Sequence, residues 1–512
     1  MTDNPTMSAP AMSAPAPARR QTYTQILKST AMIGGSSVVN IGFSIIRNKA
    51  MALLLGPEGV GLMGLYTSIA DLTQTLAGLG IQVSGVRQIA EAAGAEDSER
   101  IVRTATVLRR ISIVLGLAGA VLLAALAMPV AQFTFGDRSH TMGVALLAVA
   151  VLLRLISAGQ IALVQGMRHI ADLARINMLA ALFSTAIGIP MVYRFGQAGI
   201  VPALVAMAAM SILTSWWYAR KIKVEATAIS TSQVFEESAA LLKLGVVFMA
   251  SGFLTVGAAY AVRIIVMRQE GFEAAGLYQA AWTLGGLYAG FILQAMGTDF
   301  YPRLTAVADD DDECNRLVNE QTQISILLAG PGLIATLTIA PLVMTLFYSP
   351  AFHPAVDVLR WICLGMMLRI VSWPMGFIVL AKGDRNTFFW TEVAATVVNV
   401  GLAWLLVPRV GLVGAGMAFF GLYIWHGILI YVLVNRMSGF RWSTSNLRLG
   451  LIFLPATVIV FGVVFLLPVW PAAAVGVALT LITGLYSLRM LATLLPEETL
   501  PAFIRPWLMK AA

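Results

Sequence analysis

The sequence predicts an all-α polytopic membrane protein with about 14 transmembrane helices, a number set by its long apolar runs. Of its 512 residues, 58% are hydrophobic and only 12% are charged, whereas a soluble globular protein carries about 25% charged residues. The apolar runs recur along the whole chain, and each is close to the roughly 20 residues that span about 30 Å of hydrocarbon. A chain of this composition cannot cover a water-facing surface.

The predicted spans alternate direction through short loops. Most of the 34 Lys and Arg residues fall in loops on one side of this topology, such as 87–110, 220–243 and 436–448. This is the positive-inside pattern, so we expect that side and both termini to face the cytoplasm of a bacterial inner membrane. The pattern also explains the net charge of +8 without a nucleic-acid partner. The spans run approximately over 26–55, 60–86, 106–134, 141–165, 171–193, 199–219, 240–268, 273–300, 319–347, 353–381, 387–407, 411–435, 447–467 and 470–491.

An internal repeat relates the first six spans to the next six. The motif Gly-x-Glu-x-x-Gly-Leu follows the first span at Gly56 and the seventh span at Gly271, 215 residues apart. Two weaker matches have similar offsets, and they pair Gly166 with Gly383 and Gly199 with Gly411. An offset of six spans keeps both halves in one orientation, so we expect two lobes in a parallel repeat with substrate bound between them.

This repeat gives the domain organisation. Residues 1–24 are rich in Ala, Pro, Ser and Met, and we expect a disordered cytoplasmic tail there. The other predicted parts are an N-lobe at 25–222, a cytoplasmic linker at 223–238, a C-lobe at 239–437, and two extra helices with a cytoplasmic tail at 438–512.

Two stretches resemble a known family. The run from Leu55 to Tyr66, Leu-Gly-Pro-Glu-Gly-Val-Gly-Leu-Met-Gly-Leu-Tyr, continues at Leu76–Gln88 and looks like the start of Wzx-type O-antigen and polysaccharide flippases. The stretch Asp299–Leu304, Asp-Phe-Tyr-Pro-Arg-Leu, is also similar to their pattern. These flippases belong to the MATE-like multidrug/oligosaccharidyl-lipid/polysaccharide (MOP) exporter superfamily. The resemblance implies two six-helix lobes around a central cavity and transport by alternating access, although many O-antigen flippases have 12 spans.

Arginines inside the spans are the main candidate binding groups, because a charge in the bilayer is costly and usually faces a cavity. Arg47 lies nine residues before Gly56, and Arg263 lies eight residues before Gly271. The two halves thus place a cation at nearly the same depth, which suits a pyrophosphate. The competing interpretation is that these arginines pair with buried carbonyls or acids.

Other polar groups in the spans extend this candidate site. Arg154 and Arg369 are near-equivalent in the repeat, and either could line the cavity or tie its helix to a neighbour. Arg360 is expected to pair with Asp357, and Lys49 to extend outward. The remaining candidates are hydroxyls and amides that could bond sugar groups, or could serve close helix packing: Asn40, Ser44, Thr67, Gln74 and Gln279.

Two intramembrane acids are candidates for ion coupling or for salt bridges. Asp71 could carry a proton, ligate sodium, or pair with a cavity arginine such as Arg47. Glu392 could also couple transport to an H⁺ or Na⁺ gradient. The acidic run 309–313 is expected to be a solvated loop rather than a metal site. The two cysteines, Cys314 and Cys363, lie in different segments, so no cofactor, disulfide or metal is expected.

These observations predict a transporter. The favoured substrate is an undecaprenyl-pyrophosphate-linked oligosaccharide repeat unit of O-antigen or a related polysaccharide, moved from the cytoplasmic to the periplasmic leaflet. The alternatives are a lipid II flippase, or a MATE-type multidrug or cation antiporter, whose cavity would favour acids. A polysaccharide polymerase or glycosyltransferase is disfavoured because the outward loops are only a few residues long. A polymerase and a chain-length regulator of lipopolysaccharide biosynthesis are the expected protein partners.

Overall fold

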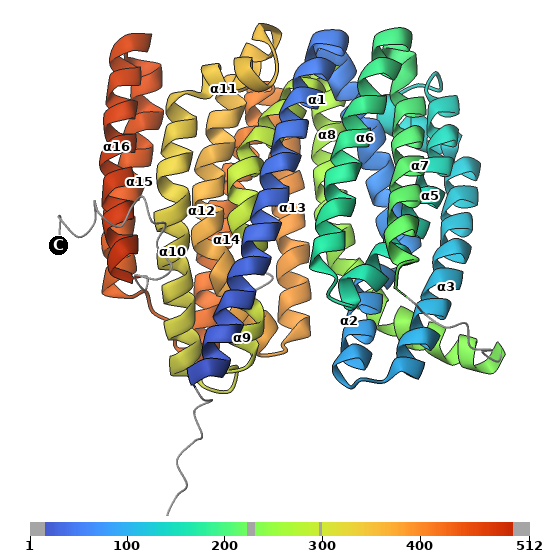
Figure 1. The fold of residues 1–512 in the computed structure, drawn as a ribbon. Coiled ribbons are helices and arrows are strands. Elements are labelled where there is room, and N and C mark those ends of the chain that lie inside the picture. Colours follow the sequence, from blue (N-terminus) through green and yellow to red (C-terminus); the bar gives the residue numbers. More distant parts are fainter. Residues whose placement is uncertain (1–15, 223–230, 296–299, 495–512) are drawn as a thin grey trace, which may run out of the picture.

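The described part of the chain is entirely helical in its regular structure (Figure 1). The computed structural model describes residues 16–222, 231–295 and 300–494. The first half contains α1 (Ala16–Gly78), α2 (Ile81–Gly94), α3 (Ser98–Ala125), α4 (Ala127–Phe135), α5 (Thr141–Gly166), α6 (Ile170–Phe195), η1 (Gly196–Gly199) and α7 (Ile200–Ala219). The second half contains α8 (Thr231–Ala295), α9 (Tyr301–Thr305), α10 (Asp311–Thr338), α11 (Ala340–Phe347), η3 (Pro350–Ala355), α12 (Val356–Ala381), α13 (Arg385–Val410) and α14 (Val413–Ser438). Two more helices, α15 (Thr444–Leu466) and α16 (Val469–Leu494), complete the chain. The predicted all-α membrane class is confirmed.

The helices are long and apolar enough to cross a membrane repeatedly. The described residues contain 10 such helical stretches, or up to 11 when the bent pair α10 and α11 is taken as one span. Three of the stretches, 41–78, 170–219 and 248–287, each include all or part of two predicted spans. The chain is therefore a multi-pass membrane protein, and the count of 14 spans stays a prediction.

The longest helices, α1 and α8, each break at one glycine. Gly56 (φ 64°, ψ −175°) and Gly271 (φ 88°, ψ 178°) take a left-handed φ that side chains with a Cβ avoid. Each long helix therefore consists of two segments that meet at this glycine. We call the end of the bundle with Gly56 and Gly271 the turn end, and the opposite end, with the Arg- and Lys-rich loops, the basic end. They lie at the top and bottom of Figure 1.

The structure confirms the parallel repeat and corrects its register. Helices α5 and α12 begin and end 215 residues apart, as do α6 and α13. The left-handed residues follow the same offset, because Arg168 pairs with Gly383, and Gly196 with Gly411. The sequence matches of Gly166 with Gly383 and of Gly199 with Gly411 were therefore displaced by two or three residues. In the corrected register, Arg154 and Arg369 are equivalent.

The caps of the helices repeat as well. Asp97 precedes α3 and accepts a hydrogen bond from the backbone N–H of Arg100 at 2.9 Å. Asp310 precedes α10 and accepts one from the backbone N–H of Glu313 at 3.0 Å. Such caps satisfy the free N–H groups at a helix start. The acidic run expected to be a loop therefore caps α10 and forms its first turn.

The first helix also begins earlier than expected. Residues from Ala16 onward belong to α1, whereas a disordered tail was predicted for 1–24. Ala16, Ala18 and Arg19 are good helix formers, which accounts for the extension. Residues 1–15 lie outside the described part. Similarly, α8 begins at Thr231, inside the predicted linker 223–238.

The two lobes, α1–α7 and α8–α14, meet along α1 and α8. At the turn end, a Cβ on Gly61 would overlap the carbonyl oxygen of Phe272, and a Cβ on Gly276 would overlap that of Pro57. These contacts are reciprocal under the repeat. At the basic end, Gly80 and the α8 residue Gly245 approach equally closely. Only glycine allows backbones this near each other.

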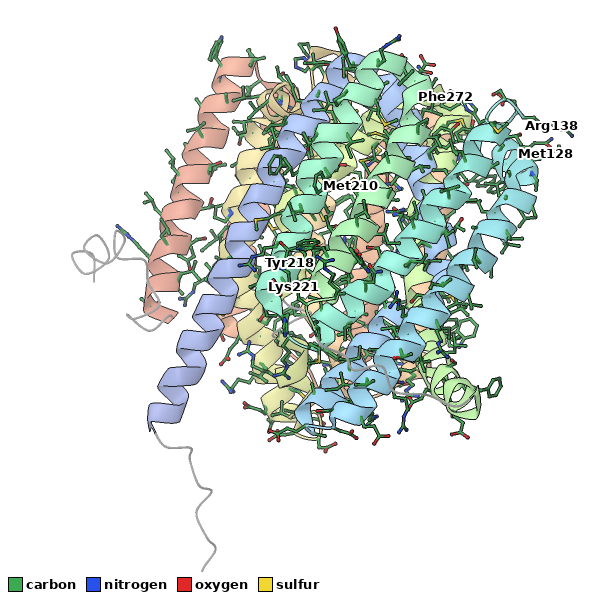
Figure 2. The ribbon with its side chains drawn as sticks, turned by 45° about the vertical axis from the view of Figure 1, so that its right-hand side comes forward. Met128, Arg138, Met210, Tyr218, Lys221 and Phe272 are labelled. Atoms are coloured by element: carbon green, nitrogen blue, oxygen red, sulfur yellow. The ribbon has the colours of Figure 1, made fainter. Side chains whose placement is uncertain are left out.

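The extra helices α15 and α16 pack on α10, at the edge of the C-lobe (Figure 1). Figure 2 shows the side chains that cover the N-lobe. Phe272 and Arg138 lie near the turn end, and Tyr218 and Lys221 lie closer to the basic end (Figure 2). Arg220 stacks on Trp217, with its guanidinium carbon 3.7 Å from the ring centroid, an arrangement typical of the membrane interface.

Candidate functional site: a central cavity with two arginines

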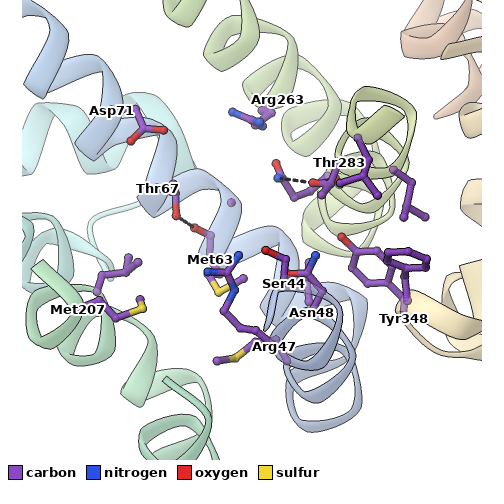
Figure 3. A pocket seen from close by; sticks show the side chains of 18 of the residues that line it. Ser44, Arg47, Asn48, Met63, Thr67, Asp71, Met207, Arg263, Thr283 and Tyr348 are labelled. Atoms are coloured by element: carbon purple, nitrogen blue, oxygen red, sulfur yellow. Dashed lines mark hydrogen bonds between the residues drawn. The ribbon is translucent and has the colours of Figure 1, made fainter. Parts of the chain in front are cut away.

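A cavity of about 400 Å³ lies between the lobes (Figure 3). Both segments of α1 and both segments of α8 line it, together with α7 and the end of α11. Two further cavities, of about 330 and 440 Å³, share lining residues with it and continue into the N-lobe and toward the basic end. The polar residues of the central cavity are Ser44, Arg47, Asn48, Thr67, Asp71, Arg263, Gln279, Thr283 and Tyr348.

Arg47 and Arg263 reach this cavity from opposite lobes, as predicted (Figure 3). The Arg47 guanidinium donates to the hydroxyl of Ser184 at 2.6 Å, and that of Arg263 donates to the hydroxyl of Ser68 at 2.6 Å. Among the described residues neither arginine forms an ion pair. The Nε of Arg263 is buried without a partner. In the part of the chain that the structure describes, the two guanidinium groups thus face one cavity and donate to neutral hydroxyls.

The acid in the cavity wall, Asp71, forms an ion pair with a third arginine, Arg154. Asp71 Oδ1 lies 2.9 Å from a guanidinium nitrogen of Arg154, and their side chains are 40% and 34% exposed. The predicted salt bridge of Asp71 therefore exists, but its partner is Arg154 rather than Arg47. This pair lines the N-lobe side of the cavities. Among the described residues, Asp71 therefore forms its ion pair with Arg154 and none with Arg47 or Arg263.

Amides and hydroxyls cover the remaining polar wall. Gln279 donates to the hydroxyl of Thr283 at 3.2 Å, while its carbonyl oxygen is buried without a partner. Thr67 donates to the carbonyl of Met63 at 2.8 Å, which satisfies its proton (Figure 3). Gln74 lines the adjoining cavity toward the basic end. The unpaired Gln279 oxygen could accept a hydrogen bond from a bound hydroxyl.

Arg369 lies apart from this cavity. It lines two cavities of about 330 and 140 Å³ that are formed by α8, α12, α13 and α14. Its guanidinium carbon is 4.4 Å from the ring centroid of Trp373 and 5.7 Å from that of Tyr423. Glu392 and the buried His426 line the same cavities. The structure thus places Arg369 and Glu392 together, within the C-lobe.

Three further predicted residues have defined positions. Arg360 pairs with Asp357 at 2.8 Å, as predicted. Lys49 does not extend outward, because its Nζ donates to the carbonyl of Thr345 in the other lobe at 2.6 Å. The side chain of Asn40 lies outside the described part of the chain.

Three polar residues of the central cavity, Asn48, Thr283 and Tyr348, were not among the candidates named from the sequence. Asn48 lies beside Arg47, so its position next to a charged residue inside a span was an available signal. Tyr348 follows α11, in a stretch expected to be an outward loop, and it enters the cavity because the chain turns back after Phe347. No local pattern indicated that turn.

The family model of "Polysaccharide biosynthesis protein" matches residues 50–357. The chain belongs to this family. A curated relative, the "Lipid III flippase" of Escherichia coli (strain K12), is 22% identical over 412 residues, covering 78% of this chain and 95% of that protein. A "Lipid III flippase" of Shigella flexneri matches to the same extent.

Solved structures share the fold of this family member. A structure described as "Lipid II flippase MurJ, inward closed conformation" has a TM-score of 0.65 at 12% identity, covering 91% of this chain and 100% of the other. An inward-facing multidrug resistance MATE family transporter of the MOP superfamily has a TM-score of 0.62 at 18% identity, covering 79% and 94%. The predicted MATE-like fold is confirmed, and the flippase relatives support the prediction of a transporter rather than an enzyme.

Proposed function

We propose that the protein is a flippase for a polyprenyl-pyrophosphate-linked oligosaccharide, the repeat unit of O-antigen or a related polysaccharide. The observation that carries this proposal is the pair Arg47 and Arg263, which face one cavity without a carboxylate partner among the described residues. Buried charges without a counter-ion are costly. A dianionic ligand held between them would offset that cost.

The chemistry of the pair suits a pyrophosphate. Arginine's planar guanidinium donates in a fork that matches phosphate oxygens. At about 4 Å and an effective dielectric constant of about 20, each charge pair contributes on the order of 4 kcal/mol before desolvation. The unpartnered Nε of Arg263 provides a donor for such an oxygen.

The rest of the cavity suits the glycan and the lipid. Gln279, Thr283 and Asn48 offer the amides and hydroxyls that sugar hydroxyls require. Leu284, Leu287 and other apolar residues form the remaining wall. The polyprenyl chain would stay in the bilayer while the head group crosses through the polar space.

The flippase relatives support this proposal, and the charge balance argues against the main alternative. A cation antiporter needs a cavity in which acids exceed bases. In the central cavity, Arg47 and Arg263 form no ion pair with a described residue, whereas Asp71 pairs with Arg154. A lipid II flippase is the second candidate, and the lipid-linked intermediate that accumulates on deletion of the gene distinguishes the two.

The proposal includes an orientation and an energy source. The basic end faces the cytoplasm of the bacterial inner membrane, and the turn end faces the periplasm. Transport runs by alternating access of the two lobes, driven by an H⁺ or Na⁺ gradient in which Asp71 or Glu392 takes part. A polymerase and a chain-length regulator receive the flipped unit.

Deletion of the gene tests the function. We expect loss of the surface polymer and accumulation of the lipid-linked repeat unit on the cytoplasmic leaflet. Wild type and Arg409→Ala restore the polymer, whereas Arg47→Ala does not. Unchanged polymer and an unchanged lipid-linked pool, in a strain without a second flippase, would contradict the proposal.

A further inference from the structure

A cation from each lobe reaches the end of a short helix in the other lobe. Lys49, on the first segment of α1, donates from Nζ to the carbonyl of Thr345 in α11 at 2.6 Å. Arg268, on the first segment of α8, donates to the carbonyls of Gln132 and Phe133 in α4 at 2.8 and 2.5 Å. Both contacts join the lobes at the turn end.

The two contacts are equivalent under the repeat. Gln132 and Thr345 are 213 residues apart, the same offset that relates α3 to α10. Lys49 and Arg268 both precede the glycine break of their helix, and their registers differ by four residues, which is about one turn. They therefore lie on the same face of equivalent helices.

The position of the acceptor carbonyls, at the ends of α4 and α11, explains why a cation binds there. The last four carbonyls of a helix lack intrahelical partners, and they carry the negative end of the helix dipole. Gln132 and Phe133 are among the last four residues of α4, and Thr345 is among the last four of α11. A cation at this place therefore both donates hydrogen bonds and meets the favourable end of the dipole.

The contacts lie at the same end of the bundle as a close approach of the lobes. There, Gly61 and Gly276 bring the two backbones together without side chains. Rocking of the lobes that opens the cavity toward the turn end must part these glycines. It must also withdraw both cations from their carbonyls.

We propose that Lys49 and Arg268 form a reciprocal latch that holds the lobes closed at the turn end, and that the latch sets the ratio of turn-end-open to turn-end-closed molecules. The inference rests on the alternating access proposed above. It does not depend on the cargo, because both cations bind carbonyls of the protein itself.

Spin-label distances across the turn end test the latch in the full chain reconstituted in lipid nanodiscs without substrate. The labels are attached at Arg138→Cys in the N-lobe and Ala351→Cys in the C-lobe, both exposed positions. The buried native cysteines, Cys314 and Cys363, are replaced by alanine. The readout is the ratio of long to short distances.

We expect Lys49→Gln and Arg268→Gln each to raise that ratio about tenfold, since hydrogen bonds to charged groups are strong. The double variant raises it about a hundredfold if the two contacts act independently. Arg409→Gln is the matched control, because Arg409 also donates to a carbonyl, that of Leu405, but within its own helix. The control keeps the wild-type ratio.

An unchanged ratio in the double variant, or an equal change in Arg409→Gln, would overturn the latch. Lys49→Arg and Arg268→Lys keep the cation and are expected to stay near the wild-type ratio, so they test the latch even if the glutamine variants fold poorly. A large change in these two would also overturn it. The flippase proposal fails separately, through an unchanged lipid-linked pool in the deletion strain.

Discussion

The N-lobe and the C-lobe hold an arginine at the same point of the same helix and surround it differently. Arg154 on α5 pairs with Asp71 at 2.9 Å, beside cavities that adjoin the central one. Arg369 on α12 stacks on Trp373 at 4.4 Å, in a cavity of its own lobe. The repeat has kept the backbone and the cation but has replaced the groups around them.

The source of the neighbouring acid shows how the lobes diverged. In the N-lobe the acid comes from the second segment of α1, where the equivalent residue of α8 is Gly286. In the C-lobe it is Glu392 on α13, where the equivalent residue of α6 is Asn177. The N-lobe arginine is therefore paired beside the central cavity, whereas the C-lobe arginine lies against aromatic rings. We expect substitutions in the two lobes to differ accordingly.

The largest effect is expected from removing the charges that face the central cavity. Arg47→Gln combined with Arg263→Gln should lower the rate of flipping more than a hundredfold, because each charge pair contributes on the order of 4 kcal/mol before desolvation. The rate is measured in proteoliposomes with a lipid-linked oligosaccharide and normalised to the amount of folded protein. Arg369→Gln, in the other cavity, should retain a higher rate, and an equal loss would remove the distinction between the cavities.

A smaller effect, on stability, is expected in the C-lobe. Trp373→Leu removes the ring under the Arg369 guanidinium and should lower the free energy of unfolding by about 2 kcal/mol. Unfolding in an SDS titration measures the change. Trp404→Leu is the control, because Trp404 is 67% exposed in the structure and lies on the outer surface of α13. Equal losses for both variants would show that the stack is unimportant.

The N-lobe pair should contribute less. The Asp71 and Arg154 side chains are 40% and 34% exposed, so screening reduces their attraction. A double-mutant cycle with Asp71→Asn and Arg154→Gln should give a coupling free energy of about 1 kcal/mol. A coupling free energy near zero would show that the ion pair does not stabilise the protein in the membrane.

The smallest effect concerns His140, which directly precedes α5 at the turn end. His140 accepts or donates a 3.0 Å hydrogen bond with the Tyr66 hydroxyl at the turn end, and the equivalent C-lobe residue is Ala355. Partial burial lowers the pKa of His140, against the opposing charge of Asp137. The neutral form is therefore favoured by folding, and its contribution to stability is complete above about pH 6.5 and falls as the pH drops below that value.

Thermal unfolding at pH 7.5 and 5.5 measures this dependence. Wild type should lose a small part of its stability at the lower pH, and His140→Gln should lose less. Equal losses in the two proteins would assign the pH dependence to other groups.

Much of this arrangement was predictable from local sequence patterns. The length of the apolar runs predicted the helices. The motif at Gly56 and Gly271 predicted the repeat, because a left-handed turn at the same place in both halves requires glycine. The placement of Arg47 and Arg263 in one cavity followed from their similar distances to that motif, nine and eight residues. Each of these features depends on spacing along a single segment.

Features that depend on distant segments were missed or misassigned. The partner of Asp71 is Arg154, on a helix that no local spacing relates to α1. The repeat register was displaced at Arg168, because a non-glycine residue takes the left-handed turn there and the match followed glycine identity instead. The contact of Lys49 with Thr345 joins residues 296 positions apart, so only the fold reveals it.

The central claim is that Arg47 and Arg263 together bind a pyrophosphate, and ligand discrimination tests it most directly. Native mass spectrometry of the purified protein would compare undecaprenyl pyrophosphate, undecaprenyl phosphate and undecaprenol. We predict that wild type prefers the pyrophosphate over the alcohol at least tenfold, and that Arg47→Gln with Arg263→Gln loses this preference while Arg409→Gln keeps it. Equal binding of the three lipids to wild type, or an unchanged preference in the double variant, would contradict the account.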